Sequence, residues 1–233
     1  MAKFIEDFSM KKMSELFHYC AYEANYINVD GWVSYAFVEN GNSLEIYWQG
    51  SYETEDWISN FWFFPKKKKP YKEMEDPYKV HSGFLFAWKK VEDLIHNKIT
   101  EVDETGNFKW KDITIVGYSH GGALTFFSTE MVWYYREDLR ENGFRSFAFE
   151  SPRVFSGWHI PKKLKERWAN MTVVRTGCDI VTHCPPWLFR FCHAGKMIKL
   201  EGDISLVEDK IPFFIKYHFP QVVYDALLKE ENK

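Results

Sequence analysis

The chain has 233 residues, of which 45% are hydrophobic and 19% aromatic, so it can bury a sizeable core, and this composition excludes a disordered or fibrous protein. Thirty basic residues against 33 acidic residues leave a net charge of −3, without the basic excess that a dedicated nucleic-acid-binding protein carries. No apolar run approaches the roughly 18 residues that cross a membrane, and the four cysteines are too few for a disulfide framework in a chain of this length.

The N-terminal third predicts a helix, a β-hairpin and an aromatic segment. Apolar residues at three- and four-residue spacings predict an amphipathic helix over 9–27. Two β-favouring runs, 32–38 and 44–48, flank an Asn-Gly pair, which is a strong hairpin signal. Residues 52–64 are rich in aromatic side chains and favour a short helix. A polar loop is expected after it, with the lysine run 66–69 as a solvated part of that loop.

The rest of the chain alternates strands with helices. A long amphipathic helix is expected over 82–99, a short apolar strand at 112–116 and a strong helix over 123–136. The alternation implies βαβ units and a mainly parallel sheet, to which the N-terminal hairpin adds antiparallel strands. The elements expected after it are a strand, a helix, two strands and a helix, at 147–149, 161–168, 171–175, 197–200 and 218–229.

Residues 117–121, Gly-Tyr-Ser-His-Gly, fit the G-x-S-x-G pattern. A serine on a sharp strand-to-helix turn has a strained backbone, so its neighbours must be small. Its Oγ then projects above the sheet, and the N–H groups of the following helix point at developing negative charge. The strand and helix expected on either side supply the context that the pattern requires, which makes Ser119 the candidate nucleophile. The alternative is a glycine-rich turn that only packs tightly.

Further short motifs accompany this turn along the chain. They are the segment 115–124 around the turn, Trp48-Gln-Gly-Ser51 with Asp56-Trp-Ile58 after it, 80–84, 147–153, 179–181 with Pro185-Pro186 beyond, and 191–195. In this order they resemble the motifs of the class 3 lipases, the fungal-lipase-like family of α/β hydrolases. The resemblance covers roughly 15–228. It departs from the family at His120, where leucine is more frequent, and at Gln49, where many members have arginine.

The resemblance implies an α/β-hydrolase fold, with a mixed, mostly parallel central sheet flanked by helices, in a single domain over 1–233. Chain order in this fold is serine, acid, histidine. Asp179 follows a predicted strand at its carboxyl end, where catalytic groups gather, and it matches the acid-bearing turn of the family. His218 matches the late histidine that precedes a C-terminal helix, so it is the predicted base. His193, which resembles a structural histidine, stays the main alternative.

The resemblance also implies the rest of the site. It places the oxyanion hole at the backbone N–H groups of Ser51 and His120, and it makes 52–64 a lid over an apolar cleft. Side chains of this lid, Trp57, Phe61 and Trp62, would then meet the substrate or a lipid interface. The alternative for 52–64 is a fixed helix packed on the core.

The sequence therefore predicts a serine-dependent carboxylic ester hydrolase that acts on lipid esters, triacylglycerol or acylglycerol, through an acyl-enzyme. It would need no metal or organic cofactor, and its partners would be the lipid ester and, through the lid, a lipid interface. A phospholipase, a short-chain or feruloyl-type esterase and a non-catalytic lipase-like scaffold remain alternatives. Residues 1–10 contain no apolar signal-peptide core, so a cytoplasmic location is expected. The hydrolytic interpretation also requires an accessible Ser119 hydroxyl.

Overall fold

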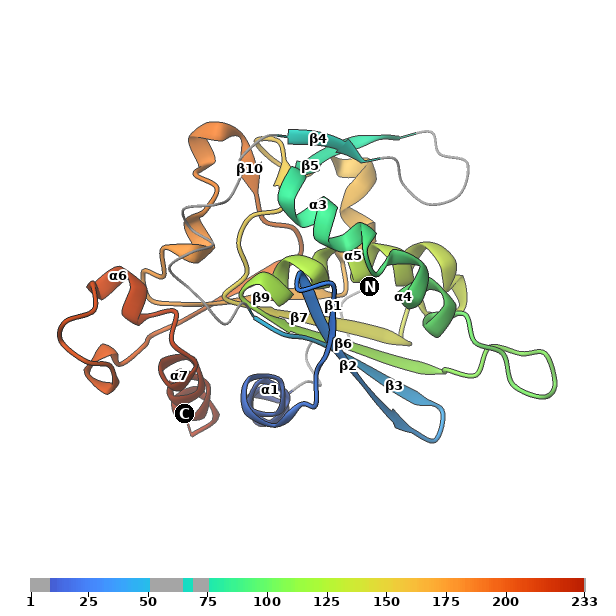
Figure 1. The fold of residues 1–233 in the computed structure, drawn as a ribbon, viewed down its shortest axis with the longest axis horizontal. Helices are drawn as coiled ribbons and strands as arrows, with labels where there is room; N and C mark the ends of the chain where they lie inside the picture. Colours follow the sequence, from blue (N-terminus) through green and yellow to red (C-terminus); the bar gives the residue numbers. More distant parts are fainter. Residues whose placement is uncertain (1–8, 51–64, 69–75, 233) are drawn as a thin grey trace.

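A seven-stranded sheet runs through the middle of the molecule (Figure 1). The computed structural model describes residues 9–50, 65–68 and 76–232. In the order in which they lie side by side, the strands are β1 (Ile27–Val29), β2 (Val33–Asn40), β3 (Ser43–Trp48), β6 (Asp112–Tyr118), β7 (Phe144–Phe149), β9 (Met171–Thr176) and β11 (Lys196–Leu200). The first two pairings are antiparallel and the other four are parallel. The predicted mixed, mostly parallel sheet is confirmed.

Helices cover both faces of this sheet, as Figure 1 shows. α3 (Ser82–Lys89), α4 (Glu92–Ile99) and α5 (His120–Tyr135) lie on one face, and α1 (Met10–His18) and α7 (Pro220–Glu231) lie on the other. Successive strand residues point to opposite faces, so Ile115 of β6 belongs to the core under α5 whereas Val116 belongs to the core under α1 and α7. The sheet is thus buried on both sides, as parallel sheets require.

The N-terminal helix ends earlier than its apolar pattern predicts. α1 passes into a π-helical turn, η1 (Tyr19–Glu23), and β1 then begins at Ile27. Asp30 and Gly31, between β1 and β2, both have positive φ, 52° and 72°, and two such residues in succession are what a type I′ hairpin turn needs. The Asp-Gly pair therefore adds an edge strand to the predicted hairpin and takes residues away from the predicted helix.

The predicted helix over 82–99 is two helices. Val91, between α3 and α4, has a non-helical backbone with φ −124° and ψ −1°. β-branched residues such as valine are disfavoured in helices, and the break lets Trp88, Val91 and Ile95 all enter the same buried core. The break therefore serves packing, which the spacing of apolar residues alone does not reveal.

A second, four-stranded sheet was not expected. Its strands are β10 (Phe191–Cys192), β8 (Phe155–Ser156), β5 (Tyr78–His81) and β4 (Pro65–Lys68). β4 contains the first three lysines of the run predicted to be a solvated loop, and that prediction is wrong for Lys68. Its side chain is buried, with Nζ 3.3 Å from Oε2 of Glu130 on α5. The buried Glu130 carboxylate also accepts hydrogen bonds from Tyr78 and Arg167. The ion pair with Glu130 compensates for the burial of the Lys68 ammonium group.

The remaining elements are short and lie between those that build the two sheets. No helix among the described residues is both long enough and apolar enough to cross a membrane. The predicted helix at 161–168 is present as a 3-10 helix. The short elements are η2 (Glu137–Leu139), η3 (Lys162–Trp168), η4 (Val181–His183), η5 (Trp187–Phe189), η6 (Ile204–Leu206) and α6 (Phe213–Lys216).

Candidate active site

Ser119 occupies the turn between β6 and α5, as the sequence predicts. Its backbone has φ 56° and ψ −120°, a conformation that is strained for any residue with a Cβ. The two glycines of the pattern make this turn possible. A Cβ on Gly117 would lie 2.2 Å from the carbonyl oxygen of Gly121, and a Cβ on Gly121 would lie 2.2 Å from that of Trp48. The turn is therefore too tight for any side chain at either glycine.

Three of the predicted site residues form one hydrogen-bonded row. Nε2 of His218 lies 2.8 Å from Oγ of Ser119, and Nδ1 of His218 lies 2.7 Å from Oδ2 of Asp179. These residues come together across 99 and 39 positions of the chain. A carboxylate only accepts, so Nδ1 carries the proton of the neutral ring and Nε2 is free to accept from the serine hydroxyl. The row has the polarity that activates a hydroxyl nucleophile.

All three residues of the row are buried: Ser119 and His218 are 1% exposed and Asp179 is 0% exposed. The hydrolytic interpretation requires a ring nitrogen beside the Ser119 hydroxyl, and Nε2 of His218 is there. It also requires that this hydroxyl be accessible, and in this structure the hydroxyl is buried. The side chain of Ser119 thus has almost no surface exposed to solvent in this structure. Exclusion of water also strengthens each electrostatic contact of the row.

Hydrogen bonds from the residues that follow Asp179 in the chain fix the position of this acid. Oδ1 of Asp179 accepts a hydrogen bond of 3.0 Å from the backbone N–H of Val181. Its backbone carbonyl accepts from the Thr182 hydroxyl at 2.9 Å and from Nδ1 of His183 at 2.7 Å. These bonds leave Oδ2 directed at His218. A carboxylate fixed in this way holds the imidazole in one tautomer and orientation.

The other candidate histidines have different partners. Nε2 of His183 accepts from the Arg175 guanidinium at 2.7 Å, so this histidine braces the acid turn. His193 donates from Nε2 to the carbonyl of Thr182 at 2.8 Å, and burial lowers its pKa to about 4. Neither has a hydrogen bond to Ser119 among the described residues. The arrangement therefore favours His218 over His193 as the base.

His120 begins α5, so its backbone N–H lies in the first turn, where N–H groups have no partner within the helix. Together with the helix dipole, this position suits an oxyanion. The His120 side chain is half-buried, and its ring lies beside Phe84 with the ring centroids 5.7 Å apart. Burial lowers the pKa of this imidazole to about 4, so the ring is neutral near pH 7. The other predicted site residues, Ser51, Trp57, Phe61 and Trp62, lie outside the described residues, as does the predicted lid.

One further carboxyl lies behind the row. Glu150, at the end of β7, has an oxygen within 4.8 Å of ligand atoms of both Asp179 and His218. Among the described residues this is the one group of three side chains close enough to hold a metal ion. Both ring nitrogens of His218 and both oxygens of Asp179 already have hydrogen bonds, so a metal ion would have to break the row. We therefore assign no metal to it. Sequence reasoning did not select Glu150, and its only signal was an acid placed immediately after a predicted strand.

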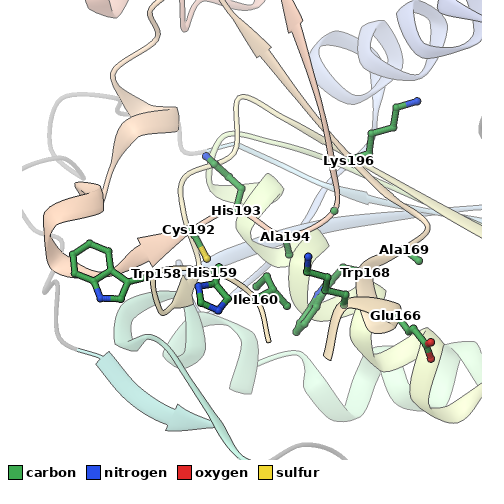
Figure 2. A pocket seen from close by; sticks show the side chains of 12 residues that line it. Trp158, His159, Ile160, Glu166, Trp168, Ala169, Cys192, His193, Ala194 and Lys196 are labelled. Atoms are coloured by element: carbon green, nitrogen blue, oxygen red, sulfur yellow. The ribbon is translucent and has the colours of Figure 1, made fainter. Parts of the chain in front are cut away.

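A hollow of about 660 Å³ lies apart from this row (Figure 2). It is formed by two segments, 158–169 and 192–196, and contains none of the three residues of the row. In Figure 2 the Trp158 ring lies at one end of it, and Glu166 and Ala169 lie toward the other. The hollow includes His193 but not Ser119, so it does not provide the space in which an ester would meet the nucleophile.

Comparison with known proteins agrees with this geometry. The family described as Lipase (class 3) matches residues 45–189, a span that includes Ser119 and Asp179. A lipase from Rhizomucor miehei is 27% identical over 168 residues, which are 69% of this chain and 43% of that protein. A secreted mono- and diacylglycerol lipase from Fusarium solani is 30% identical over 156 residues, which are 66% of this chain and 43% of that protein. The chain thus spans less than half the length of these curated relatives.

Solved structures show the same fold at lower identity. The triacylglyceride lipase of Rhizomucor miehei has a TM-score of 0.62 at 19% identity, with 82% of this chain and 80% of that chain covered. A triacylglycerol lipase whose catalytic centre is a serine-protease triad has a TM-score of 0.66 at 19% identity, covering 84% and 82% of the two chains. The predicted α/β-hydrolase fold is confirmed. The matching family span and the shared fold, taken with the ordered motifs around Ser119, show that the chain belongs to the class 3 lipase family.

Proposed function

We propose that this protein is a serine hydrolase that cleaves carboxylic esters of lipids through an acyl-enzyme intermediate. The observation that carries the proposal is the buried, continuous row of hydrogen bonds from Ser119 through His218 to Asp179. A strained serine at a strand-to-helix turn, backed by a neutral imidazole and a carboxylate, is the arrangement that activates a hydroxyl toward an ester carbonyl.

The mechanism follows from the atoms of the row. Oγ of Ser119 attacks the carbonyl carbon while Nε2 of His218 takes its proton, and the Asp179 carboxylate stabilises the imidazolium that forms. The tetrahedral intermediate then collapses, the ester C–O bond breaks, and His218 returns the proton to the leaving alcohol. Water attacks the acyl-serine in the same manner, with His218 as base and then acid. The products are a free fatty acid and the alcohol, and Ser119 is regenerated.

The negative charge on the tetrahedral oxygen needs donors. We assign one of them to the backbone N–H of His120, which supports the proposal because it lies at the N-terminus of α5 immediately after the nucleophile. The second donor is proposed to be the backbone N–H of Ser51, on the family resemblance alone. Loss of one such donor costs about 3 kcal/mol of transition-state stabilisation.

We propose acylglycerols as the substrate class. One relative is a mono- and diacylglycerol lipase, and one protein with the same fold is a triacylglycerol lipase. Hydrolysis rates on p-nitrophenyl esters of increasing chain length, on emulsified triacylglycerol, on monoacylglycerol and on phospholipid vesicles test this assignment. Faster turnover of the phospholipid than of both acylglycerols would assign a phospholipase instead, and activity confined to the shortest esters would assign a short-chain esterase.

Covalent labelling tests the reaction class itself. A fluorophosphonate probe phosphonylates an activated serine, so wild-type protein is expected to be labelled and Ser119→Ala is expected not to be. Ser128→Ala is a matched control, since Ser128 is a buried serine of α5 whose hydroxyl donates to the carbonyl of Leu124. A wild-type protein that folds but never takes up the probe would favour a non-catalytic scaffold.

We also propose that residues 52–64 act as the lid. The support is the burial of Ser119, since a hydrolase with a buried nucleophile must open before it binds an ester. Lid opening at a lipid surface predicts a rise in rate when a short triglyceride passes its solubility limit. Trp57→Ser and Trp62→Ser should weaken that rise while the rate on dissolved ester is preserved. A rate that stays smooth across the limit in every variant would contradict the lid.

A further inference from the structure

Glu150 stands in an uncommon place for a glutamate. It follows β7 directly, is fully buried, and has a left-handed backbone with φ 47°, a conformation that favours glycine. Its backbone N–H donates to the carbonyl of Val174 at 2.9 Å, and the carbonyl before it, that of Phe149, accepts from the N–H of Ser119 at 2.9 Å. The glutamate is therefore fixed beside the nucleophile turn.

The carboxyl of Glu150 is directed at the back of the hydrogen-bonded row. One of its oxygens lies within 4.8 Å of a carboxylate oxygen of Asp179 and of a ring nitrogen of His218. Neither oxygen has a hydrogen bond of good geometry among the described residues, although Asp179 and Thr176 both face it. A buried carboxyl without a well-formed hydrogen bond is unusual in a folded protein, and this one lies beside a second carboxyl.

The charges around Glu150 decide its protonation. The groups that face it are Asp179 after β9, the His218 imidazole before α7, the Thr176 hydroxyl and the Tyr118 phenol at the end of β6. None of them is a permanent cation, and among the described residues no lysine or arginine forms an ion pair with Glu150. Burial, and next the charge of Asp179, raise the pKa of the Glu150 carboxyl well above its ordinary value.

We propose that Glu150 is a positioning residue of this site, and that Glu150 and Asp179 together form a carboxyl pair that holds one proton and one negative charge behind His218. The inference rests on the proposed function, because it assigns the acid position of the same row to two residues. With its proton, Glu150 is a neutral acid that can turn its O–H toward Asp179 and keep that carboxylate charged. Two carboxyls so close in a dry site cannot both ionise readily.

The pair has a consequence that a single acid lacks. Replacement of Asp179 by asparagine removes the neighbouring charge, which is the second of the two causes that raise the pKa of Glu150, and leaves the burial of Glu150 unchanged. Glu150 then loses its proton more easily, and its carboxylate, within 4.8 Å of the His218 ring, can stabilise the imidazolium in place of Asp179. The glutamate is thus a reserve acid for the row.

A double-mutant cycle tests the proposal, with kcat/KM on a soluble p-nitrophenyl ester as the readout. Glu150→Gln alone retains a donor toward Asp179 and is expected to lower kcat/KM by about threefold or less. In the Asp179→Asn background the same change is expected to lower it by at least tenfold, because the reserve acid is lost. Such coupling between residues is what a cycle isolates. Equal factors in both backgrounds would overturn the proposal.

The pH dependence supplies a readout that a purely structural role would not move. The residual kcat/KM of Asp179→Asn is expected to rise with pH as Glu150 ionises, since only its anion stabilises the imidazolium. The double variant should lack this rise. Glu45→Gln is the matched control: Glu45 of β3 accepts a hydrogen bond from Tyr47, lies outside the row, and should change both backgrounds by the same factor.

A measurement on the parent protein guards against variants that fail to fold. The infrared spectrum of the wild-type protein in D₂O at neutral pH is expected to show the C=O stretch of a protonated buried carboxyl, and Glu150→Gln should lack it. A spectrum without that band would overturn the proposal. Fluorophosphonate labelling of the wild-type protein separates the two questions, because labelling with no coupling between Glu150 and Asp179 rejects the pair and leaves the hydrolase intact.

Discussion

The ring of Tyr118 stacks on the imidazole of His218, with the ring centroids 5.2 Å apart and the planes 23° apart. Its hydroxyl also donates a hydrogen bond to the backbone carbonyl of His218. The residue that precedes the nucleophile therefore holds the proposed base both by its ring and by its backbone. Tyr118 belongs to β6, so the central sheet positions the proposed base, although His218 itself lies in the short connection between α6 and α7.

Tyr118→Phe tests this arrangement. The phenyl ring keeps the stack but leaves the carbonyl of His218 without its buried donor, so the free energy of unfolding should fall by about 1–3 kcal/mol. The proposed base should also become less well oriented, and kcat should fall by more than KM rises. Denaturant unfolding and steady-state kinetics on a soluble ester measure the two effects. Unchanged values in both would show that the hydroxyl does not hold His218.

Gly121→Ala tests the close approach at the nucleophile turn. Its Cβ would lie 2.2 Å from the carbonyl oxygen of Trp48, and the three nearest atoms all belong to the backbone of Trp48 and Gln49, so no side chain can move to make room. We expect the free energy of unfolding to fall by more than about 2 kcal/mol, in the range of overpacked cores, together with loss of probe labelling. Gly41→Asn is the control, because Gly41 has φ 59° in open space and asparagine tolerates that backbone.

Lys68→Met tests the buried ion pair that holds β4. The change leaves the Glu130 carboxylate with Arg167 as its remaining cation among the described residues, so the free energy of unfolding should fall by about 3 kcal/mol. Adding Glu130→Gln should recover part of that loss, since it removes the buried charge. Lys66→Met, at an exposed position of the same strand, should change stability by less than about 0.5 kcal/mol. Equal losses at both lysines would argue against the pair.

Three histidines with lowered pKa values predict how stability depends on pH. Burial lowers the pKa of His81, His120 and His193 to about 4, from 6.5. The unfolded chain therefore binds more protons than the folded protein between pH 6.5 and 4, so stability is complete above pH 6.5 and is lost as the pH falls through that window. His120→Phe should flatten this part of the curve, measured by denaturant unfolding at each pH. An unchanged slope would mean that the folded protein does not keep the His120 ring neutral between pH 6.5 and 4.

Much of the fold could be predicted because it depends on local pattern. The Asn-Gly hairpin, the strand at 112–116 and the helix after Ser119 all have short-range signals, and the structure contains them. The second sheet could not be predicted in the same way. Its strand β4 consists of proline and lysine, residues that are depleted in strands, and it is held by Glu130 from a distant helix.

The candidate site likewise contains residues that the sequence could predict and one that depends on contacts between distant parts of the chain. The order of Ser119, Asp179 and His218 along the chain, together with the family resemblance of the motifs around them, predicts that they meet, and the structure places them in one row. Glu150 was missed because a single acid after a strand has no special meaning in sequence. Its importance comes from Asp179 and His218 approaching it in three dimensions. The helix break at Val91 was missed for a similar reason, since packing decides it.

The separation of 99 positions between Ser119 and His218 has a consequence for the protein while it is being made. The ribosome delivers the hydroxyl first, and many more peptide bonds must form before the imidazole that would activate it leaves the exit tunnel. A chain that ends before residue 218 therefore carries the serine hydroxyl without the imidazole that is proposed to activate it. On the proposed mechanism, the order of synthesis alone keeps the hydroxyl unactivated until the late segment that carries His218 has folded.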